Sequence, residues 1–431
     1  MALLRRTSLG VLFATLDREA VLRQRVRTLG VVRRQGKIDL YAMLCVVVLG
    51  VAVRGPVAIA QLGHIMAEVT GVVVARSSFW DRISPAFAKL VRSVLDDVVV
   101  ANRARVVAPP GVLSGFADVF AVDATVVKLH DDLAHLWRGT RRNSARAALK
   151  VHTWIRAFTG EIVKYRVTQD AHGDGRAFGI DQALRGVLVL FDKGYSSPSL
   201  WRRIDHVGGY FLTRLPRDRA PTITGENRRH RGRARKVVGR GLRDVLEGLQ
   251  RSVLDVEAPF RCCVRKYGSS KNRWVEHPFR LVAIRDRRGH YEVFVTNAPP
   301  ELLPAEAVAR TYRLRWEVET FFRTAKTGSG LRELPSAKAH IVETLVYAAL
   351  LRATTSMQAL AKFRRETADA LGLLVNPGQW HTWWNRTIAG ALAELVLSGE
   401  HLRDHELARL LADPNRGRPT NRSTFSVCAY A

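Results

Sequence analysis

The sequence predicts an α/β protein in which a mixed β-sheet is flanked by helices, with an all-β insertion and a helical N-terminal domain. Three observations support this prediction. Apolar residues recur at helical spacing over residues 1–110, and short β-branched apolar runs alternate with helical stretches over residues 111–215. Strands of alternating polarity then follow over residues 216–300. The helical pattern returns over residues 301–365 and continues into a C-terminal region, 366–431, that ends in a polar tail.

The N-terminal region is expected to be helical throughout and to bind DNA. Its helical periodicity covers residues 21–32, 40–53, 57–69 and 87–100. Short helices around the Thr70-Gly71 break, with arginines nearby, would suit a module that reads DNA. An ordinary helical bundle fits the same pattern equally well. The APPG segment at 108–111 marks the end of this region.

The next segment, residues 111–215, contains the strands of the expected sheet. Apolar or β-branched runs predict strands at 116–127, 149–156, 161–167, 187–191 and 210–215. Thr159-Gly160 is a hairpin turn between the second and third strands, and short helices are expected at 177–184 and 199–206. This order of elements predicts a mixed sheet with helices packed on it.

The insertion at 216–300 combines a basic segment with antiparallel strands. Strands are expected at 260–264, 279–284 and 291–296. The segment 228–235 is expected to follow a DNA backbone, and a solvated loop is the alternative. Within this segment, Arg229, Arg231 and Arg233 are expected to contact DNA. Helices should resume at 305 and continue through 340–363 and 388–411.

Charge and cysteine content limit the classes of function. The chain carries 68 Lys and Arg against 39 Asp and Glu, a net charge of +29 spread along its length. Such a polycation calls for a polyanionic partner, and DNA or RNA is the usual one; a ribosome-associated protein, a binder of anionic membranes and an arginine-rich proteome are the alternatives. The 4 cysteines form no C-x-x-C pair, which argues against structural zinc or disulfides and indicates a reducing compartment. The longest apolar run, 40–53, is short for a membrane span and no signal peptide is recognised, so we expect a cytoplasmic protein without a membrane segment.

Two aspartates stand at informative points of the expected strands. Asp123 lies inside an apolar strand, where a carboxylate is costly unless it is paired or bound to metal. Asp192 directly follows the apolar run 187–191, at the strand end where open α/β sheets place their ligands. Two such residues on adjacent strands can share one divalent cation, and oxygen ligands favour Mg²⁺ or Mn²⁺. The competing acidic residues, none of which closes such an apolar run, are Asp170, Asp174 and Asp181.

A third motif lies on a predicted helix after residue 305. Tyr312, Arg315, Glu319 and Lys326 share an arc of roughly 60° on one face if the helix is continuous at about 100° per residue. A neighbouring apolar face, formed by Leu314, Val318, Phe321 and Phe322, would dock the helix on the sheet. The helix would then present one carboxylate among cationic groups. A surface helix with incidental Arg–Glu pairs is the alternative.

These motifs together resemble the DDE transposases of the insertion-sequence-four type, whose RNase H-like core carries a Tyr-x2-Arg-x3-Glu-x6-Lys signature. Tyr312, Arg315, Glu319 and Lys326 match every position of that signature. The DKGY block at 192–195 resembles the family's second-aspartate motif, and VDAT at 122–125 resembles its first, although Ala follows the aspartate where Gly is more common. The β-rich insertion is a further point of similarity. The resemblance covers residues 116–326.

The resemblance implies an RNase H-like core, formed by 111–215 and 301–365, with a catalytic triad of Asp123, Asp192 and Glu319. In the family such a triad holds two metal ions, Mg²⁺ or alternatively Mn²⁺, that activate the attacking oxygen and stabilise the leaving one. Arg315 and Lys326 would hold phosphates, and Tyr312 would position a phosphate or a terminal base. The implied activity is that of an insertion-sequence transposase, which cleaves transposon ends and transfers the 3′-hydroxyl strand into target DNA, a cut-and-paste reaction.

Partners and further contacts follow from the same resemblance. The substrates would be terminal inverted repeats and target DNA, bound by a homodimer in the nucleoid-associated cytoplasm. Trp274 is the candidate for stacking a flipped base. Lys150, close to Asp123 in strand order, is a further candidate DNA contact, and a lysine paired within the sheet is an equal alternative. Two other functions compete: a transposase-derived DNA-binding protein without catalysis, and an RNase H-like nuclease or resolvase.

Overall fold

The structure is a computed structural model of the 431-residue chain. It describes residues 19–31, 40–49, 62–64, 66–67, 73, 75–140, 145–171, 174–195, 197–227, 236–264, 272–329, 331, 333–334, 336–371, 375, 379–380 and 384. The helices expected at 57–69 and 388–411 lie wholly or mostly outside these residues, as does the basic segment 228–235 with Arg229, Arg231 and Arg233. Among the described helices, none combines the length and the apolar character needed to cross a membrane.

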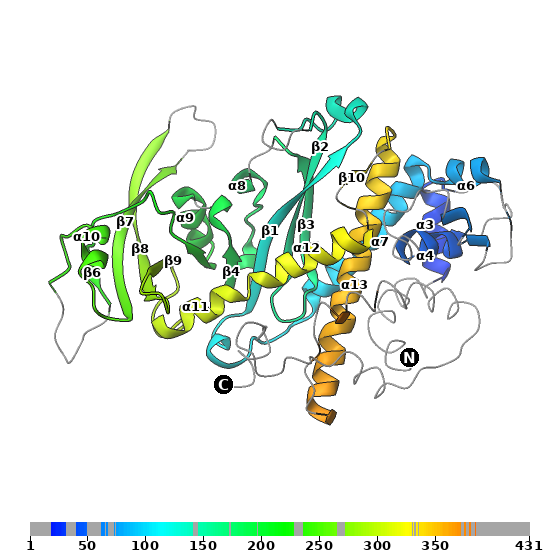
Figure 1. The fold of residues 1–431 in the computed structure, drawn as a ribbon. Helices are drawn as coiled ribbons and strands as arrows, with labels where there is room; N and C mark the ends of the chain where they lie inside the picture. The colour runs from blue at the N-terminus through cyan, green and yellow to red at the C-terminus, as the bar shows by residue number, and fades with distance from the viewer. Residues whose placement is uncertain are drawn as a thin grey trace.

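The described strands form one 10-stranded mixed sheet with the order β3-β2-β1-β4-β5-β9-β8-β7-β6, and β10 (Glu333–Leu334) pairs with the end of β1 (Figure 1). β1 (Asp118–Leu129), β2 (Ala148–Arg156) and β3 (Ile162–Gln169) form an antiparallel meander. β4 (Val187–Phe191) and β5 (Tyr210–Arg214) then add in parallel on the other side of β1. The predicted α/β fold, a mixed sheet flanked by helices, is confirmed.

The apolar sequence of β4 follows from cover on both faces of the sheet. All of VLVLF is buried. Val189 and Phe191 enter the hydrophobic cluster shared with α9 (Pro198–His206), whereas Leu188 and Leu190 enter the cluster beneath α11 (Ala305–Arg313). A strand buried on both faces has no position for a polar residue along its length. Asp192 is the first residue after the end of β4.

The helices around β4 cover the sheet much as the sequence predicts, although the one expected at 177–184 differs. α9 occupies the expected position, and α12 (Trp316–Ser329) packs on β1 and β2 and against α13 (Ala339–Leu371). The helix expected at 177–184 is instead two short pieces, α8 (Asp174–Ala177) and a 3-10 turn at Gln182–Leu184. The Asp181 side chain caps that 3-10 turn by accepting from the Ala183 amide, and such a capping residue does not continue a helix.

The insertion continues the central sheet rather than forming a separate one. β9 (Tyr291–Thr296) pairs antiparallel with β5, and β8 (Arg273–Arg285), β7 (Val253–Val264) and β6 (Gly225–Glu226) follow outward. The expectation of an all-β insertion is wrong in one respect, because α10 (Leu242–Glu247) lies within it. The amphipathic pattern of that short helix is hidden in an arginine-rich stretch, although Leu242 and Val245 pack into the core.

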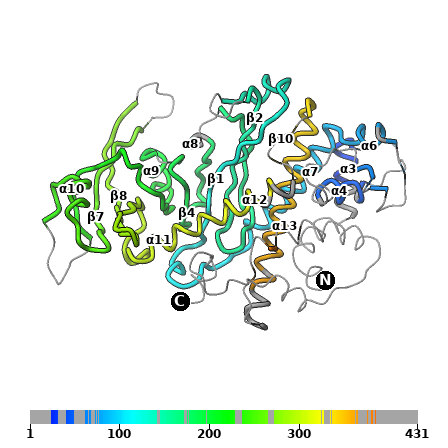
Figure 2. Tube along the Cα trace, viewed as in Figure 1, coloured from blue at the N-terminus to red at the C-terminus, as the bar shows by residue number. Residues whose placement is uncertain are grey.

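The N-terminal helices pack on the core at the end opposite the insertion (Figure 2). They are α3 (Glu19–Thr28), α4 (Leu40–Leu49), α6 (Arg76–Arg82) and α7 (Pro85–Ala104). The Ser84 side chain accepts from the Phe87 amide and caps α7, which packs along α13 and β3. One hydrophobic cluster takes in parts of α4, α7, α12, α13, β1 and β2. The N-terminal helices therefore share their core with the sheet.

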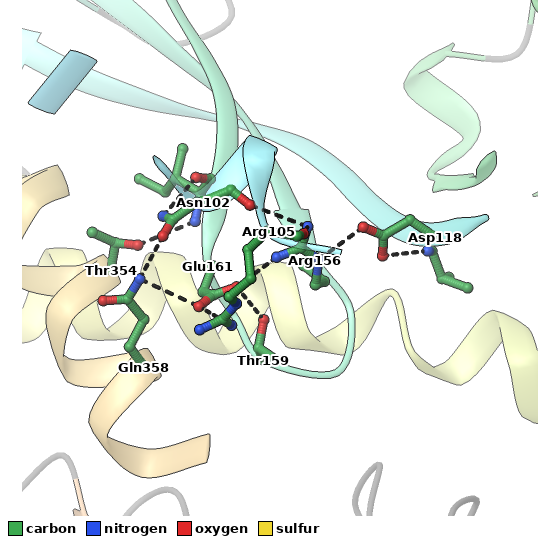
Figure 3. Close-up of polar contacts among 10 residues, drawn as sticks. Asn102, Arg105, Asp118, Arg156, Thr159, Glu161, Thr354 and Gln358 are labelled. Atoms are coloured by element: carbon green, nitrogen blue, oxygen red, sulfur yellow. Dashed lines mark hydrogen bonds and ion pairs between the residues drawn. The ribbon is translucent and has the colours of Figure 1, made fainter. Parts of the chain in front are cut away.

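A buried ionic network ties α7, β1, the β2–β3 hairpin and α13 together (Figure 3). Arg156 donates from Nε to Asp118 at 2.8 Å and from Nη1 to Glu161 at 2.7 Å. Its Nη2 donates to the backbone carbonyls of Asn102 and Arg105. Each nitrogen of this buried guanidinium therefore has an acceptor, as a buried charge requires.

Candidate functional site

The two predicted aspartates lie side by side because of the register between β1 and β4. Val122 pairs with Phe191 across these parallel strands. Asp123 directly follows Val122, and Asp192 directly follows Phe191, so the two aspartates occupy neighbouring positions on adjacent strands. The prediction that they lie on adjacent central strands is thereby fulfilled in the structure.

Asp123 is partly buried within β1. Its Oδ1 accepts a hydrogen bond from the Ala124 amide at 2.8 Å. Burial raises the pKa of the Asp123 carboxyl to about 6; the Ala124 hydrogen bond and the Arg315 charge oppose that rise, and the charges of Asp192 and Glu319 add to it. The Asp192 and Glu319 carboxylates are therefore each near enough to repel the Asp123 carboxylate, and a cation beside Asp123 would relieve that repulsion.

The helix that carries Glu319 differs from the prediction. α11 ends at Arg313, and α12 begins at Trp316. Between them the backbone tightens into a turn, in which the Leu314 amide donates to the Thr311 carbonyl and the Arg315 amide to the Tyr312 carbonyl. The expected single helical face is therefore wrong: Tyr312 belongs to α11, Arg315 to the turn, and Glu319 with Lys326 to α12. The apolar face is confirmed, since the four side chains expected to dock it are all buried: Leu314, Val318, Phe321 and Phe322.

Arg315 lies between the carboxylates. Its Nη2 donates to Glu319 Oε1 at 2.5 Å, and its Nη1 lies 3.9 Å from Asp123 Oδ2. The guanidinium also stacks over the Tyr312 ring, 5.7 Å from its centroid. Arg315 Nε is buried and has no hydrogen-bond partner among the described residues. The cation is thus held by one strong contact and one long one.

Tyr312 supports this arrangement from within the protein. Only 2% of the residue is exposed, and its hydroxyl faces the Phe191 carbonyl at 3.5 Å. Burial raises the pKa of Tyr312 to about 12. Arg214, at the end of β5, places its guanidinium 5.1 Å from the same ring. Tyr312 therefore contacts Arg315 and the strand that ends at Asp192, rather than standing open for DNA.

A cavity of about 320 Å³ opens beside Asp123 and Glu319. Its lining residues are Asp123, Ala124, Thr125, Glu319, Phe322, Arg323 and Lys326. The cavity brings Lys326 to the same space as two of the three carboxylates, as the sequence motif predicts. Two carboxylates, which can bind cations, and two basic side chains, which can bind phosphate, therefore line the same cavity.

Two of the remaining predicted contacts, Lys150 and Trp274, do not line this cavity. Lys150 Nζ is 3.6 Å from Asp170 Oδ1, and both side chains are largely buried, which corresponds to the alternative of a paired strand lysine. Trp274 lies on β8 in the insertion and is 54% exposed, with the Arg261 guanidinium 5.3 Å from its ring. Its exposure leaves the ring available for stacking.

Two residues near the site escaped prediction. Arg214 follows the apolar part of β5, the strand next to β4, and also pairs with Glu292 of β9 at 3.2 Å. Its position at the end of a predicted parallel strand was the available signal. Arg323 lies one helical turn beyond Glu319 and three residues before Lys326, so helical spacing would have found it.

The donor set fits hard divalent cations, since all three groups offer carboxylate oxygens as ligands. Over the described part of the chain, however, no three His, Cys, Asp or Glu side chains lie close enough together to hold a metal ion. In this arrangement the Glu319 carboxylate forms an ion pair with Arg315. Gathering the three carboxylates on an ion would require Glu319 to exchange that partner.

Residues 114–353 match the family model described as "Transposase DDE domain". A transposase for insertion sequence element IS231F from Bacillus thuringiensis subsp. israelensis is 23% identical over 333 residues, which are 69% of this chain and 68% of that protein. The IS231E transposase of B. thuringiensis subsp. finitimus is 22% identical over 60% of this chain and 59% of its own length. A putative transposase, y4zB, from Sinorhizobium fredii is 27% identical over 46% and 48% respectively. The matches to IS231E and y4zB therefore span less than two thirds of the length of those two relatives.

One solved structure is similar in outline. It is a piggyBac transposase synaptic complex with hairpin DNA, with a TM-score of 0.45 and 9% sequence identity. The match covers 94% of this chain and 85% of that one.

Proposed function

The chain belongs to the DDE transposase family, and from this premise we infer that it is the DNA transposase of an insertion sequence. It would cut the ends of its element and join the freed 3′-hydroxyl strands to target DNA. The observation that carries this proposal is the register of β1 and β4, which sets Asp123 and Asp192 side by side next to Glu319.

Members of this family use divalent metal ions, and we propose Mg²⁺, with Mn²⁺ as a substitute, held by Asp123, Asp192 and Glu319. When bound, two such ions would activate the attacking oxygen and neutralise the leaving one. The chain's own residues would do the positioning. Lys326 and Arg323 line the cavity beside the carboxylates and would bind the phosphates that flank the scissile bond.

Arg315 and Tyr312 would act as a pair. The Tyr312 ring lies against the guanidinium and thereby limits its orientation, so that Arg315 can bind a phosphate with its fork of N–H groups. Tyr312 itself would be a positioning residue, since its hydroxyl faces the Phe191 carbonyl.

Wider DNA contacts are proposed for surfaces away from the triad. The N-terminal region 1–110 would recognise the terminal inverted repeats, and the exposed Trp274 would stack a flipped base. Arg229, Arg231 and Arg233 would follow the DNA backbone, and the net charge of +29 favours such contacts. A homodimer bridging two ends, acting on nucleoid DNA in the cytoplasm, completes the proposal.

The full chain should nick DNA that bears the element's terminal inverted repeats when Mg²⁺ is added. Glu319→Gln should abolish nicking and leave DNA binding intact, because it removes a carboxylate ligand while keeping the side-chain shape. Nicking by Glu319→Gln at the wild-type rate would contradict the assignment. DNA binding without any metal-dependent cleavage would favour a non-catalytic descendant, and cleavage without joining of a supplied 3′-hydroxyl end would favour a nuclease.

A further inference from the structure

Arg315 places its guanidinium between Glu319 and Asp123, two of the three carboxylates that would hold a metal ion. Its side chain is 9% exposed, and it donates to Glu319 Oε1 at 2.5 Å while lying 3.9 Å from Asp123 Oδ2. The Glu319 contact joins residues four apart at the start of α12, so it forms without any movement of the helix. As long as this contact persists, Glu319 offers a divalent ion only part of its oxygen donors.

The hold on Arg315 is weaker than the hold on Arg280, another buried arginine. Arg280 donates to both Asp255 oxygens, at 2.9 and 2.6 Å, and to the carbonyls of Ala298 and Leu303. Arg315 has one short carboxylate contact, and its buried Nε has no hydrogen-bond partner among the described residues. A buried donor without an acceptor costs free energy that a new acceptor would recover.

A phosphate is the acceptor that fits this guanidinium. Arginine binds phosphate through two parallel N–H···O bonds, and the cavity next to Arg315's carboxylate partners is already lined by Arg323 and Lys326. A phosphate that entered there would bring the additional acceptors that Arg315 lacks. Glu319 would then be left unpaired beside Asp123, whose pKa is raised partly by the Glu319 charge. A divalent cation is what such a pair of carboxylates would bind.

We propose that Arg315 is a displaceable internal counter-ion: a DNA phosphate draws it from Glu319, and the released carboxylate completes the metal site. This inference rests on the proposed transposase function. Metal and DNA then bind cooperatively, and by linkage each raises the affinity of the other by the same factor. The chain without DNA has a weak metal site, which guards against metal-dependent cutting before the correct DNA backbone is in place.

The first test measures Mn²⁺ binding to the full chain without DNA, from the electron paramagnetic resonance signal of free Mn²⁺. Arg315→Gln should bind Mn²⁺ about tenfold more tightly than the wild type, since one charge-assisted hydrogen bond no longer competes. Arg313→Gln is the matched control, because Arg313 is an exposed cation two residues away on α11. It should stay within about twofold of the wild type, since exposed charges are strongly screened. An unchanged Mn²⁺ affinity in Arg315→Gln would overturn the proposal.

The second test measures the coupling itself. The probe is a duplex of the terminal repeat that already ends in its 3′-hydroxyl, so no bond remains to be cut at that end. Its affinity, followed by fluorescence anisotropy at constant ionic strength, should rise about tenfold with Mn²⁺ in the wild type and in Arg313→Gln. Arg315→Gln should lose this rise. If Arg315→Gln keeps the wild-type coupling factor, Arg315 is not the link.

A further variant covers the case in which Arg315→Gln does not fold. Arg315→Lys keeps the charge, but its single ammonium cannot bridge Glu319 and Asp123 as a fork. It should tighten Mn²⁺ binding about threefold without DNA, and a wild-type affinity would count against the proposal. The two proposals can fail separately: lost coupling with intact cutting removes only the counter-ion role, whereas intact coupling without cutting removes only the catalytic function.

Discussion

Arg156 and Arg315 are both buried arginines next to the same sheet, and they differ in how completely they are paired. Arg156 has an acceptor for each of its guanidinium nitrogens, drawn from β1, α7 and the β2–β3 hairpin (Figure 3). Glu161, one of those acceptors, in turn receives bonds from Thr159, Gln358 and Arg105. The network leaves no guanidinium nitrogen of Arg156 without an acceptor, so the side chain is poorly placed to bind a ligand.

Arg315 has one close carboxylate, one distant carboxylate and an Nε with no described acceptor. A cation in that state is available to an incoming anion. Burial of the charge therefore does not set these two arginines apart, whereas the completeness of their hydrogen bonding does. The following predictions test this distinction.

The largest expected effect is on stability, at the completed network. Arg156→Met should lower the free energy of unfolding by about 3–5 kcal/mol, because it leaves the buried Asp118 without its cation and Glu161 with Arg105 alone. Arg315→Gln should cost only about 1 kcal/mol, the net value of one hydrogen bond. Urea denaturation of both variants measures the contrast, and equal losses would break the distinction between the two arginines.

The pH dependence of the free energy of unfolding should reveal the raised pKa of the Asp123 carboxyl. The pKa of Asp123 is raised to about 6 by burial, against about 3.9 in an unfolded chain. The folded state therefore holds a proton that the unfolded state has lost between these values, and stability falls as pH rises from about 4 to about 6.

Asp123→Asn removes that ionisation. In the absence of divalent ions it should be more stable than the wild type by about 1–3 kcal/mol at pH 8 and equal to it at pH 4. Thermal or urea unfolding across this range checks the prediction. A variant that is less stable than the wild type at pH 8 would show that the Asp123 charge is already well compensated.

The smallest effect is expected at a lysine that the structure pairs. Lys150→Ala should change the affinity for the transposon end by less than about twofold, because Lys150 is engaged with Asp170. Lys326→Ala, in the cavity, should weaken binding several-fold. Anisotropy with a labelled terminal-repeat duplex compares the two, and a larger loss in Lys150→Ala would restore that residue as a DNA contact.

The sequence was sufficient to predict the parts of the site that depend on local pattern. The apolar run that becomes β4 is continuous because both of its faces are covered, and Asp192 stands out as its end. The Thr159-Gly160 turn was also readable: Gly160 adopts φ +68°, and a Cβ there would meet Met357 of α13 at 2.6 Å.

Other features depend on tertiary contacts and were out of reach. The break between α11 and α12 has no glycine or proline to announce it, so Tyr312 and Glu319 were placed on one continuous helix. The Arg156 network joins residues far apart in the chain, such as Asn102 and Gln358, whose pairing no periodicity encodes. The four-residue spacing of Arg315 and Glu319 indicates that they can pair, but only the structure gives the short distance of that contact.

The central claim is that Asp123, Asp192 and Glu319 form one metal site once DNA is bound. The most direct measurement is Mn²⁺ binding to the complex with a terminal-repeat duplex, corrected for the DNA alone, in Asp123→Asn, Asp192→Asn and Glu319→Gln. Each substitution should lower the Mn²⁺ affinity of the complex by at least about tenfold, since each removes one ligand charge. A wild-type affinity in any one of the three variants would contradict the claim for that residue, and in all three it would end the account.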